Sequence, residues 1–260
     1  MKPFSQLPRA IARRLRYALC DIDDTITTDG KLTADAYTAL WRLHDAGLCV
    51  IPVTGRPAGW CDLIVRQWPV KAVVGENGAF VYYMQGDRKQ VFTHPSVAHD
   101  VADKLCAVRD AVLLGVPGSR VASDQFARIY DLAIDFCEDP PFLSLEDAAR
   151  IKDICVAMGA EAKVSSIHVN TWFGAYDKLG MTRLFMREIL GECDIEQTVV
   201  YFGDSPNDEP MFGFFPHACA VANIKPFIQS LCHLPAYVTE HEGGAGFAEA
   251  AEHLLCIRAS

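Results

Sequence analysis

Four short polar segments of this 260-residue chain carry side chains whose types and spacing could perform chemistry. The first is Asp21-Ile22-Asp23-Asp24-Thr25, in which Asp21 and Asp23 can face the same way on extended backbone. Two carboxylates this close repel each other unless a proton or a cation lies between them, and Mg²⁺, which prefers oxygen ligands, meets that need. One carboxylate could then attack a phosphorus atom while the other protonates the leaving oxygen. The same segment also fits an acidic turn with a helix cap.

The second and third segments are suited to holding a phosphate group. In Val53-Thr54-Gly55-Arg56-Pro57, Thr54 offers a hydroxyl and Gly55 allows a close backbone approach at an expected helix start. In Tyr176-Asp177-Lys178-Leu179-Gly180, Lys178 could neutralise phosphate and keep a nucleophilic carboxylate ionised. Taken singly, the Thr54 segment also fits an ordinary helix cap, and Lys178 also fits an ordinary surface lysine.

The fourth segment, Gly203-Asp204-Ser205-Pro206-Asn207-Asp208, directly follows an apolar run at 199–202. Asp204 and Asp208 project from one loop, so together they could complete the oxygen shell of a divalent cation. A plain turn is the alternative, although the buried strand expected before it favours a site.

Buried strands are predicted at four apolar runs, three of which precede these segments. The runs lie at 17–22, 48–53, 71–74 and 198–202. A helix between the first two, capped by Thr33 and ended by Gly47, would bury Tyr37, Leu40, Trp41 and Leu43. Strand, helix and strand in that order imply a parallel sheet, whose carboxyl edge is where ligands bind. A hairpin is predicted after the turn at 76–78, from strand residues 79–84 and the turn at 85–87.

The pattern changes after His94 and returns after Phe173. Between them we predict helices at 97–113 and 145–158 and strands at 127–136 and 164–171, in a segment with seven basic and twelve acidic residues. The earlier rhythm then resumes with helices at 181–190 and 208–214 and a strand at 218–221. The fold class is therefore α/β, with a Rossmann-like parallel-sheet core of residues 1–93 and 174–260 and an inserted α+β domain of residues 94–173.

Composition excludes several classes of protein. The formal net charge of −9 argues against a nucleic-acid binder, and no apolar stretch approaches the ~18 residues of a membrane span. No leader segment is evident, so we expect a cytoplasmic protein. We expect it to be a monomer or a homodimer. The ten cysteines form no Cys-x-x-Cys pair and are expected to be small buried residues in a reducing compartment.

Together, the four segments in this order resemble the haloacid dehalogenase superfamily. The insert between the second and third motifs, and the segment Glu76-Asn77-Gly78-Ala79, resemble its type IIB branch, which includes many sugar-phosphate phosphatases. One departure is that Leu179 separates Lys178 from Gly180, where the family often has glycine directly after the lysine. We expect this to shift the start of the helix by one residue.

The resemblance implies roles for the acidic residues. Asp21 would be the nucleophile that forms an aspartyl-phosphate, and Asp23 the general acid and then the base. Mg²⁺ would be held by the Asp21 carboxylate, the Asp23 carbonyl and Asp204, with Asp208 acting through water or through its neighbours. Asp24 is then a turn or capping residue.

The resemblance also implies how the substrate is held. Thr54 and Lys178 would bind phosphoryl oxygens, beside Gly55 and Arg56, and Asn207 would orient Lys178 or the phosphate. Such chemistry depends on charge neutralisation and in-line positioning above all.

The insert would be a cap that closes over the site and excludes water. Ser166, His168 and Asn170 alternate on one predicted strand face and could hydrogen-bond a polyol leaving group, although an exposed polar face fits equally. Arg128 and Asp131 are similar candidates, and Trp172-Phe173 fits hinge packing better than a sugar platform. The acidic cap favours a neutral sugar over an anionic leaving group.

These inferences predict a Mg²⁺-dependent phosphatase whose partner is a small phosphomonoester, with a sugar phosphate favoured. A phosphomutase of the same fold would instead isomerise a sugar phosphate without net phosphate release. A non-catalytic phospho-acceptor module is the third alternative, and a stable aspartyl-phosphate would identify it.

Overall fold

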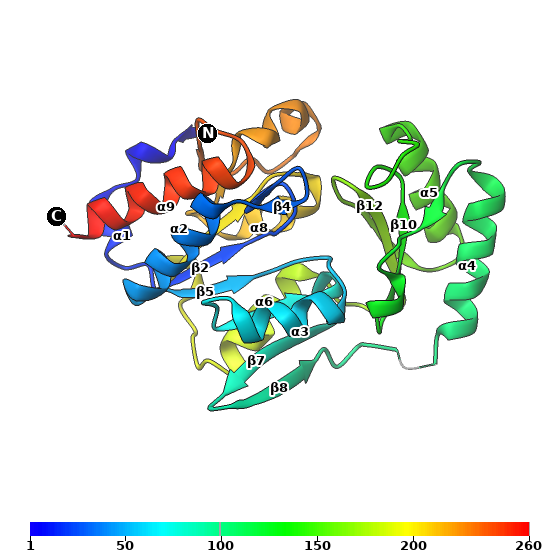
Figure 1. The fold of residues 1–260 in the computed structure, drawn as a ribbon, viewed down its shortest axis with the longest axis horizontal. Coiled ribbons are helices and arrows are strands. Elements are labelled where there is room, and N and C mark those ends of the chain that lie inside the picture. The colour runs from blue at the N-terminus through cyan, green and yellow to red at the C-terminus, as the bar shows by residue number, and fades with distance from the viewer. Residues whose placement is uncertain (99, 260) are drawn as a thin grey trace.

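A six-stranded parallel sheet lies at the centre of the fold, in a computed structural model that describes residues 1–98 and 100–259. The strand order is β1-β15-β14-β13-β2-β5 (Figure 1). The bounds are β1 Lys2–Pro3, β2 Tyr17–Cys20, β5 Cys49–Pro52, β13 Val199–Gly203, β14 Cys219–Ala220 and β15 Tyr237–Val238. The predicted α/β fold class with a parallel core sheet is therefore confirmed.

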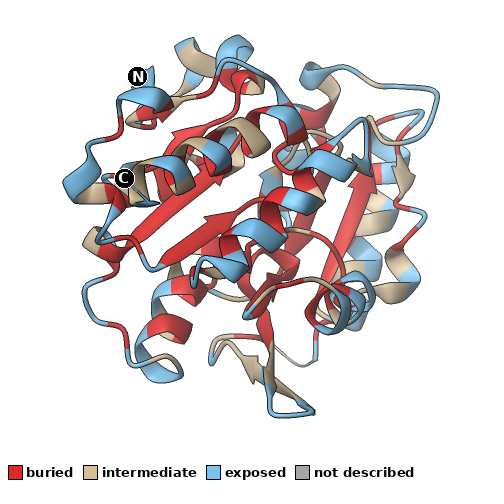
Figure 2. Ribbon diagram, turned by 60° about the vertical axis from the view of Figure 1, so that its left-hand side comes forward, coloured by how far each residue is buried: buried red, intermediate tan, exposed pale blue. Residues whose placement is uncertain are grey.

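Helices cover both faces of this sheet, and the side-chain alternation of β2 shows why. Ala18 and Cys20 pack into one core with α1, α2, α3 and α9, whereas Tyr17 and Leu19 pack into another with α6 and α8. Figure 2 shows the buried strands between helices whose outer faces are exposed. The helices are α1 Arg9–Ala12, α2 Ala34–Asp45, α3 Ala58–Gln67, α6 Lys178–Glu188, α7 Ile195–Thr198, α8 Glu209–Phe214 and α9 Gly243–Ala259.

The predicted helix after the first motif is α2, and its ends are as expected. The Thr33 hydroxyl accepts a hydrogen bond from the Ala36 amide, and Gly47 takes a positive φ of 81° just past the end. The predicted inner face was wrong at Trp41, which is 43% exposed, because Ala36 and Ala39 fill the core side with Leu40 and Leu43.

A second, antiparallel sheet extends the core beside β5. Its strands are β6 Ala72–Gly75, β7 Phe80–Gln85 and β8 Arg88–Thr93, and a parallel bridge from Val53 to Val74 joins it to the chain after β5. The predicted hairpin is confirmed, with Gly86 and Asp87 between paired Gln85 and Arg88. A smaller hairpin, β3 Thr27–Thr28 with β4 Lys31–Leu32, follows the first motif.

The elements from α4 to β12 form a separate layer with its own hydrophobic core, which we call the cap unit (Figure 1). Its antiparallel sheet has the order β11-β12-β10-β9, and α4 and α5 pack against it. The bounds are α4 Ala102–Gly115, β9 Arg120–Val121, β10 Asp131–Asp135, α5 Leu145–Ala157, β11 Glu161–Val164 and β12 His168–Trp172. We retain 94–173 as the proposed limits of the cap domain.

Three predicted elements of the cap unit differ from the structure. The prediction of a single strand at 164–171 was wrong, because these residues belong to the β11–β12 hairpin. The Ser165 hydroxyl closes the turn of this hairpin: it accepts a hydrogen bond from the His168 amide and donates one to the His168 carbonyl. The strand at 127–136 is reduced to β10, and 125–127 are a 3-10 turn. The helix expected from 97 begins at Ala102, while residue 99 lies outside the described residues.

Several sequence expectations about the whole chain can also be compared with the structure. Cys20, Cys61, Cys155 and Cys219 are buried as expected, but the cysteines at 106, 193, 232 and 256 are exposed. Within 1–98 and 100–259, no helix has the length and apolar character required to cross a membrane.

Candidate active site

The predicted site segments meet at one edge of the parallel sheet, because they follow strands that are neighbours in it. Asp21 follows β2, Thr54 follows β5 and Asp204 follows β13, and β13, β2 and β5 are adjacent and parallel. The Asp21 amide donates to the Phe202 carbonyl at 2.9 Å, which continues the β2–β13 ladder up to the site. This is the carboxyl edge, where parallel sheets bind ligands.

Three buried carboxylates form the centre of the site. Oxygen atoms of Asp21, Asp204 and Asp208 all lie within 4.8 Å of one another. The Thr25 hydroxyl donates to Asp204 Oδ1 at 3.1 Å, and the Tyr201 hydroxyl donates to Asp208 Oδ1 at 2.7 Å. The structure thus brings together acidic residues that are far apart in the sequence.

Asp208 reaches this cluster by folding back over Gly203. Its Oδ2 atom accepts from the Asp204 amide at 3.0 Å, and a Cβ added to Gly203 would lie 2.5 Å from that oxygen. A side chain at this position would therefore displace Asp208 from the cluster.

Lys178 is the first residue of α6, so its backbone position is set by the cap of that helix. Asp177 caps α6 by accepting from the Gly180 amide at 2.6 Å, which shows how the chain accommodates Leu179 after the lysine. Lys178 Nζ lies 3.0 Å from Asp21 Oδ1 and 3.0 Å from Asp208 Oδ1.

The site contains more negative charge than Lys178 balances. Burial raises the pKa of Asp21 above its ordinary value of 3.8, while the Lys178 ammonium opposes that shift. Burial raises the pKa of Asp204 further, and the carboxylates of Asp208 and Asp21 add to the effect. Burial alone would lower the pKa of Lys178, but Asp208 and Asp21 outweigh it and raise that pKa.

These features fit a divalent cation bound by oxygen. Asp204 makes no ion pair in the described part of the chain, and its carboxylate lies beside those of Asp21 and Asp208. A hard cation among these oxygens would stabilise the ionised carboxylates that burial disfavours.

The Thr54 segment presents backbone and hydroxyl groups next to this cluster. Thr54 is fully buried, its amide donates to Val74 at 2.9 Å, and its hydroxyl accepts from the Arg56 amide at 3.0 Å. Gly55 is packed closely by side chains, because an added Cβ would lie 3.1 Å from Asn77 and 3.3 Å from Asn170.

Asp23 points toward Arg56 rather than toward the three-carboxylate cluster. Arg56 Nε donates to both Asp23 oxygens at 3.0 Å, and Nη2 donates to Oδ1 at 2.8 Å. Nη1 of the same guanidinium reaches Asp124 at 3.3 Å and Glu138 at 2.9 Å, both in the cap unit. Arg56, predicted to bind substrate, thus lies among three carboxylates.

Among the cap candidates, His168 and Asn170 line the site from the opposite side, whereas Arg128, Asp131 and Trp172 do not line the cavity over Asp21. His168 Nε2 lies 2.8 Å from Glu138, and Asn170 donates to Asp131 at 3.1 Å. Arg128 and Asp131 form an ion pair with fully buried side chains, and Arg128 also donates to the Gly55 carbonyl at 2.9 Å. Trp172 is buried and stacks on Tyr176, as the packing interpretation predicted.

The remaining candidates are less tightly bound. Ser166 lies in the β11–β12 turn rather than on a strand, beside Asp24. Asn207 is half-buried, and its side-chain oxygen accepts from the Ser205 hydroxyl at 2.9 Å.

Cavities lie between the cap unit and the core, and two of them adjoin the acidic cluster. A small one of about 10 Å³ is bounded by Asp21, Asp23, Gly55, Arg56, His168, Asn170 and Asn207, among others. A larger one of about 630 Å³ lies beside it, between α5 and the 3-10 helix Ala222–Ser230. The cap unit is therefore closed over the acidic cluster and leaves room next to it.

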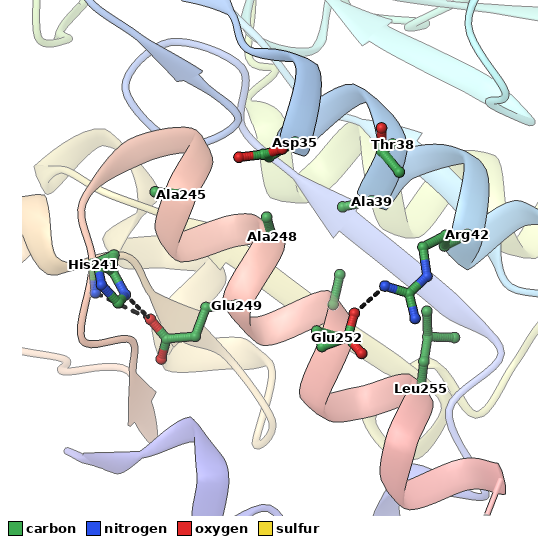
Figure 3. A pocket seen from close by; sticks show the side chains of 11 residues that line it. Asp35, Thr38, Ala39, Arg42, His241, Ala245, Ala248, Glu249, Glu252 and Leu255 are labelled. Carbon is green, nitrogen blue, oxygen red and sulfur yellow. Dashed lines mark hydrogen bonds and ion pairs between the residues drawn. The ribbon is translucent and has the colours of Figure 1, made fainter.

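Another hollow lies away from these residues, between α2 and α9 (Figure 3). It measures about 380 Å³ and is edged by the ion pairs of Arg42 with Glu252 and of His241 with Glu249. None of the four motifs contributes to it, so it is not part of the candidate site.

Sequence reasoning missed residues that hold the site from a distance. Thr25, Asp124 and Glu138 carry no local signal, because their partners are remote in the chain, and Tyr201 was read only as part of an apolar strand although it bonds to Asp208. Glu76 was read as part of a turn and of a segment that resembles the type IIB branch, without a role of its own, yet its carboxylate accepts hydrogen bonds from the amides of Ala58, Ile129 and Tyr130 and so ties the core to the cap unit. Its positive φ of 43°, unusual outside glycine, was not predictable from the sequence.

Comparisons with known proteins agree with this arrangement. Residues 18–110 match the haloacid dehalogenase-like hydrolase family. The chain is 26% identical over 244 residues to a phosphoglycolate phosphatase from Pyrobaculum aerophilum, covering 90% of this chain and 93% of that protein.

Solved structures share the whole architecture. The C-terminal domain of trehalose-6-phosphate phosphatase from C. albicans has a TM-score of 0.73 at 15% identity, covering 98% of both chains. The subclass IIB sugar phosphatase BT4131 has a TM-score of 0.64 at 16% identity, covering 92% of this chain and 98% of that one. The resemblance carried by the four motifs is confirmed to this extent: residues 18–110 match the haloacid dehalogenase-like hydrolase family, and the chain has the fold of a subclass IIB sugar phosphatase of that superfamily.

Proposed function

We propose that this hydrolase is a Mg²⁺-dependent phosphatase that cleaves a small phosphomonoester through an aspartyl-phosphate on Asp21. The observation that carries the proposal is the buried cluster of Asp21, Asp204 and Asp208 with Lys178 Nζ 3.0 Å from two of its carboxylates. Phosphoryl transfer depends on a positioned nucleophile and on neutralised charge, and this cluster offers both.

Mg²⁺ would be held by the Asp21 carboxylate, the Asp23 carbonyl and Asp204, with Asp208 bound through water or through its neighbours. Bound there, Mg²⁺ supplies positive charge to the phosphoryl oxygens and to the carboxylates. The crowding of three buried acids around one lysine supports this assignment.

Each side chain of the site then has its own role in the reaction. Asp21 attacks phosphorus, while Lys178 keeps that carboxylate ionised and, with Thr54 and the Gly55 backbone, binds the phosphoryl oxygens. Asp23 gives a proton to the leaving oxygen and later takes one from the water that hydrolyses the aspartyl-phosphate. Asn207, which faces the small cavity with Asp21, orients the phosphate.

The leaving group would be accommodated where the cap unit meets the core. His168 and Asn170 face the small cavity, and the larger cavity next to it is lined by Asp24, Ser166 and Phe227 among others. No lysine or arginine lines that larger cavity in the described ranges. A cavity lined by hydroxyl, carboxylate and aromatic groups without a cation suits a neutral sugar. The carboxylate of phosphoglycolate would instead lie near Asp24 and Glu242 with no cation to pair with it, and the like charges would repel.

Release of inorganic phosphate from a panel of phosphomonoesters tests this function. We expect hexose phosphates to have a higher kcat/KM than phosphoglycolate, and EDTA to abolish turnover until Mg²⁺ is restored. Isomerisation without phosphate release would instead identify a phosphomutase. A stable aspartyl-phosphate without turnover would identify a phospho-acceptor module, and either result would overturn the proposal.

A further inference from the structure

Arg56 connects the carboxylate of Asp23 in the core with two carboxylates of the cap unit. Its side chain is 4% exposed, and each of its three guanidinium nitrogens donates to Asp23, Asp124 or Glu138. The Trp60 ring covers the guanidinium at 4.3 Å from its centroid. A guanidinium engaged on its edges and on one face has little capacity left for a substrate phosphate.

The two cap carboxylates are themselves fixed by other cap residues. Glu138 is hydrogen-bonded to His168 of β12 at 2.8 Å, which with Arg56 lowers the pKa of Glu138 to about 2 despite its partial burial. Asp124 also accepts from Arg128, at 3.3 Å and 3.4 Å. The cap unit therefore presents a preformed acidic edge to Arg56 instead of two free side chains.

These ion pairs depend on the position of the cap unit. The cap unit covers the small cavity over Asp21 with His168 and Asn170, so we expect the cap unit to move away when a phosphomonoester enters and to close again over it. Movement away from the core would separate Arg56 from Asp124 and Glu138 but would leave its pairing with Asp23, which lies in the core. The guanidinium is thus fixed from both sides only in the closed arrangement.

The pairing also distinguishes the two oxygens of Asp23. Oδ1 accepts from both Nε and Nη2, at 3.0 Å and 2.8 Å, whereas Oδ2 accepts from the shared Nε at 3.0 Å and, among the described residues, from no other donor. Oδ2 therefore keeps the capacity to carry a proton toward a leaving group. Holding Oδ1 fixes the direction in which Oδ2 points.

We propose that Arg56 is a positioning residue that aims the Asp23 carboxyl at the leaving oxygen when Glu138 and Asp124 of the closed cap unit hold its other side. The inference rests on the proposed function, in which Asp23 is the general acid. It replaces the expected role of Arg56 in binding substrate and couples closure of the cap unit to proton transfer.

Leaving groups that differ in their need for a proton test this coupling. The kcat/KM would be measured with dinitrophenyl, p-nitrophenyl, phenyl and alkyl phosphates for wild type, Glu138→Gln, Asp124→Asn and Arg56→Lys. Because dinitrophenolate leaves without protonation, we expect changes within about twofold for its ester and losses on the order of tenfold to a hundredfold for alkyl esters. Asp23→Asn should show the same selective loss of kcat/KM for alkyl esters, and this loss should be larger than in the other variants.

Two control variants separate positioning from general damage. Glu146→Gln removes an acidic group from an exposed part of α5 and should match wild type across the series. Glu138→Asp keeps the charge and should recover part of the alkyl phosphate activity. Thermal unfolding of each variant shows that it is folded, and Glu138, 25% exposed in its side chain, tolerates substitution better than the buried arginine.

Equal losses for all esters, or no loss in Glu138→Gln and Asp124→Asn, would overturn the coupling. Those results are distinct from a failure of the proposed function, because wild type would still release phosphate in Mg²⁺. If wild type releases no phosphate from any ester, the proposed function fails first.

Discussion

Lys178 Nζ lies 3.0 Å from Oδ1 of Asp21, inside a site where both side chains are almost fully buried. The same ammonium contacts Asp208 at 3.0 Å, so one cation links the end of β2 to the loop after β13. This pairing stabilises Asp21 in its ionised form, whereas burial alone favours the protonated form.

Replacing that cation should abolish most of the activity. Lys178→Met removes the charge that stabilises the ionised Asp21 and the phosphoryl oxygens, so kcat should fall on the order of a hundredfold or more. The change also leaves Asp208 buried without its ion pair, so the melting temperature should fall. Lys71→Met, at an exposed position, is the matched control, and full activity in Lys178→Met would refute the assignment.

The metal-free protein should lose stability as the pH rises. Burial raises the pKa of Asp21 and Asp204 above 3.8, so the native state keeps protons that the unfolded chain has already released. The free energy of unfolding therefore decreases as the pH rises from 3.8, the pKa of aspartate in the unfolded chain, through the raised pKa values of the native state.

Thermal unfolding in EDTA at about pH 5 and about pH 8 measures this effect, because the two conditions leave the carboxylates in different protonation states. We expect the wild-type protein to have a lower melting temperature at the higher pH. The melting temperature of Asp204→Asn should depend less on pH, and Mg²⁺ should restore the melting temperature of wild type at the higher pH. A metal-free protein that is more stable at the higher pH would contradict the electrostatic account of the cluster.

Gly203→Ala should damage the cluster through geometry alone. The added Cβ would lie 2.5 Å from Asp208 Oδ2 and 2.7 Å from its Cγ, so Asp208 must move. We expect a stability loss of about 1–3 kcal/mol and a weaker response of the melting temperature to Mg²⁺. Tyr201→Phe, which removes only the 2.7 Å hydrogen bond to Asp208, should show a milder form of both effects.

Phe227→Ala tests whether the larger cavity receives the leaving group. Phe227 lines that cavity but lies outside the acidic cluster, so the variant should raise KM for hexose phosphates by roughly threefold to tenfold while kcat changes little. The KM for a methyl ester, which is too small to reach this ring, should stay near that of wild type. An equal rise for both esters would place the leaving group elsewhere.

The sequence was most informative where chemistry follows a short buried strand. The motifs after β2, β5 and β13 could be placed at one sheet edge because apolar runs mark these strands and parallel strands end together. Strands of two residues, such as β1 and β15, carry no periodicity and were not predicted. The split of 164–171 into β11 and β12 was also missed, although the consecutive polar residues Ser165 and Ser166 interrupt the alternation expected of a single strand.

Contacts between distant segments set a second limit. Arg56 was expected to bind substrate beside Thr54, but its partners Asp124 and Glu138 lie 68 and 82 residues away, with no pattern that joins them. Glu76 likewise bonds to backbone amides, which any residue except proline supplies. Such pairings follow from the packing of the cap unit on the core.

The nucleophile assignment is tested most directly by phosphate release from Asp21→Asn in saturating Mg²⁺. An amide keeps the size of the side chain but cannot form the aspartyl-phosphate, so turnover of a hexose phosphate should fall at least on the order of ten-thousandfold while the protein stays folded. Turnover by the folded variant within about tenfold of wild type, with the asparagine verified intact by mass spectrometry, would contradict the account.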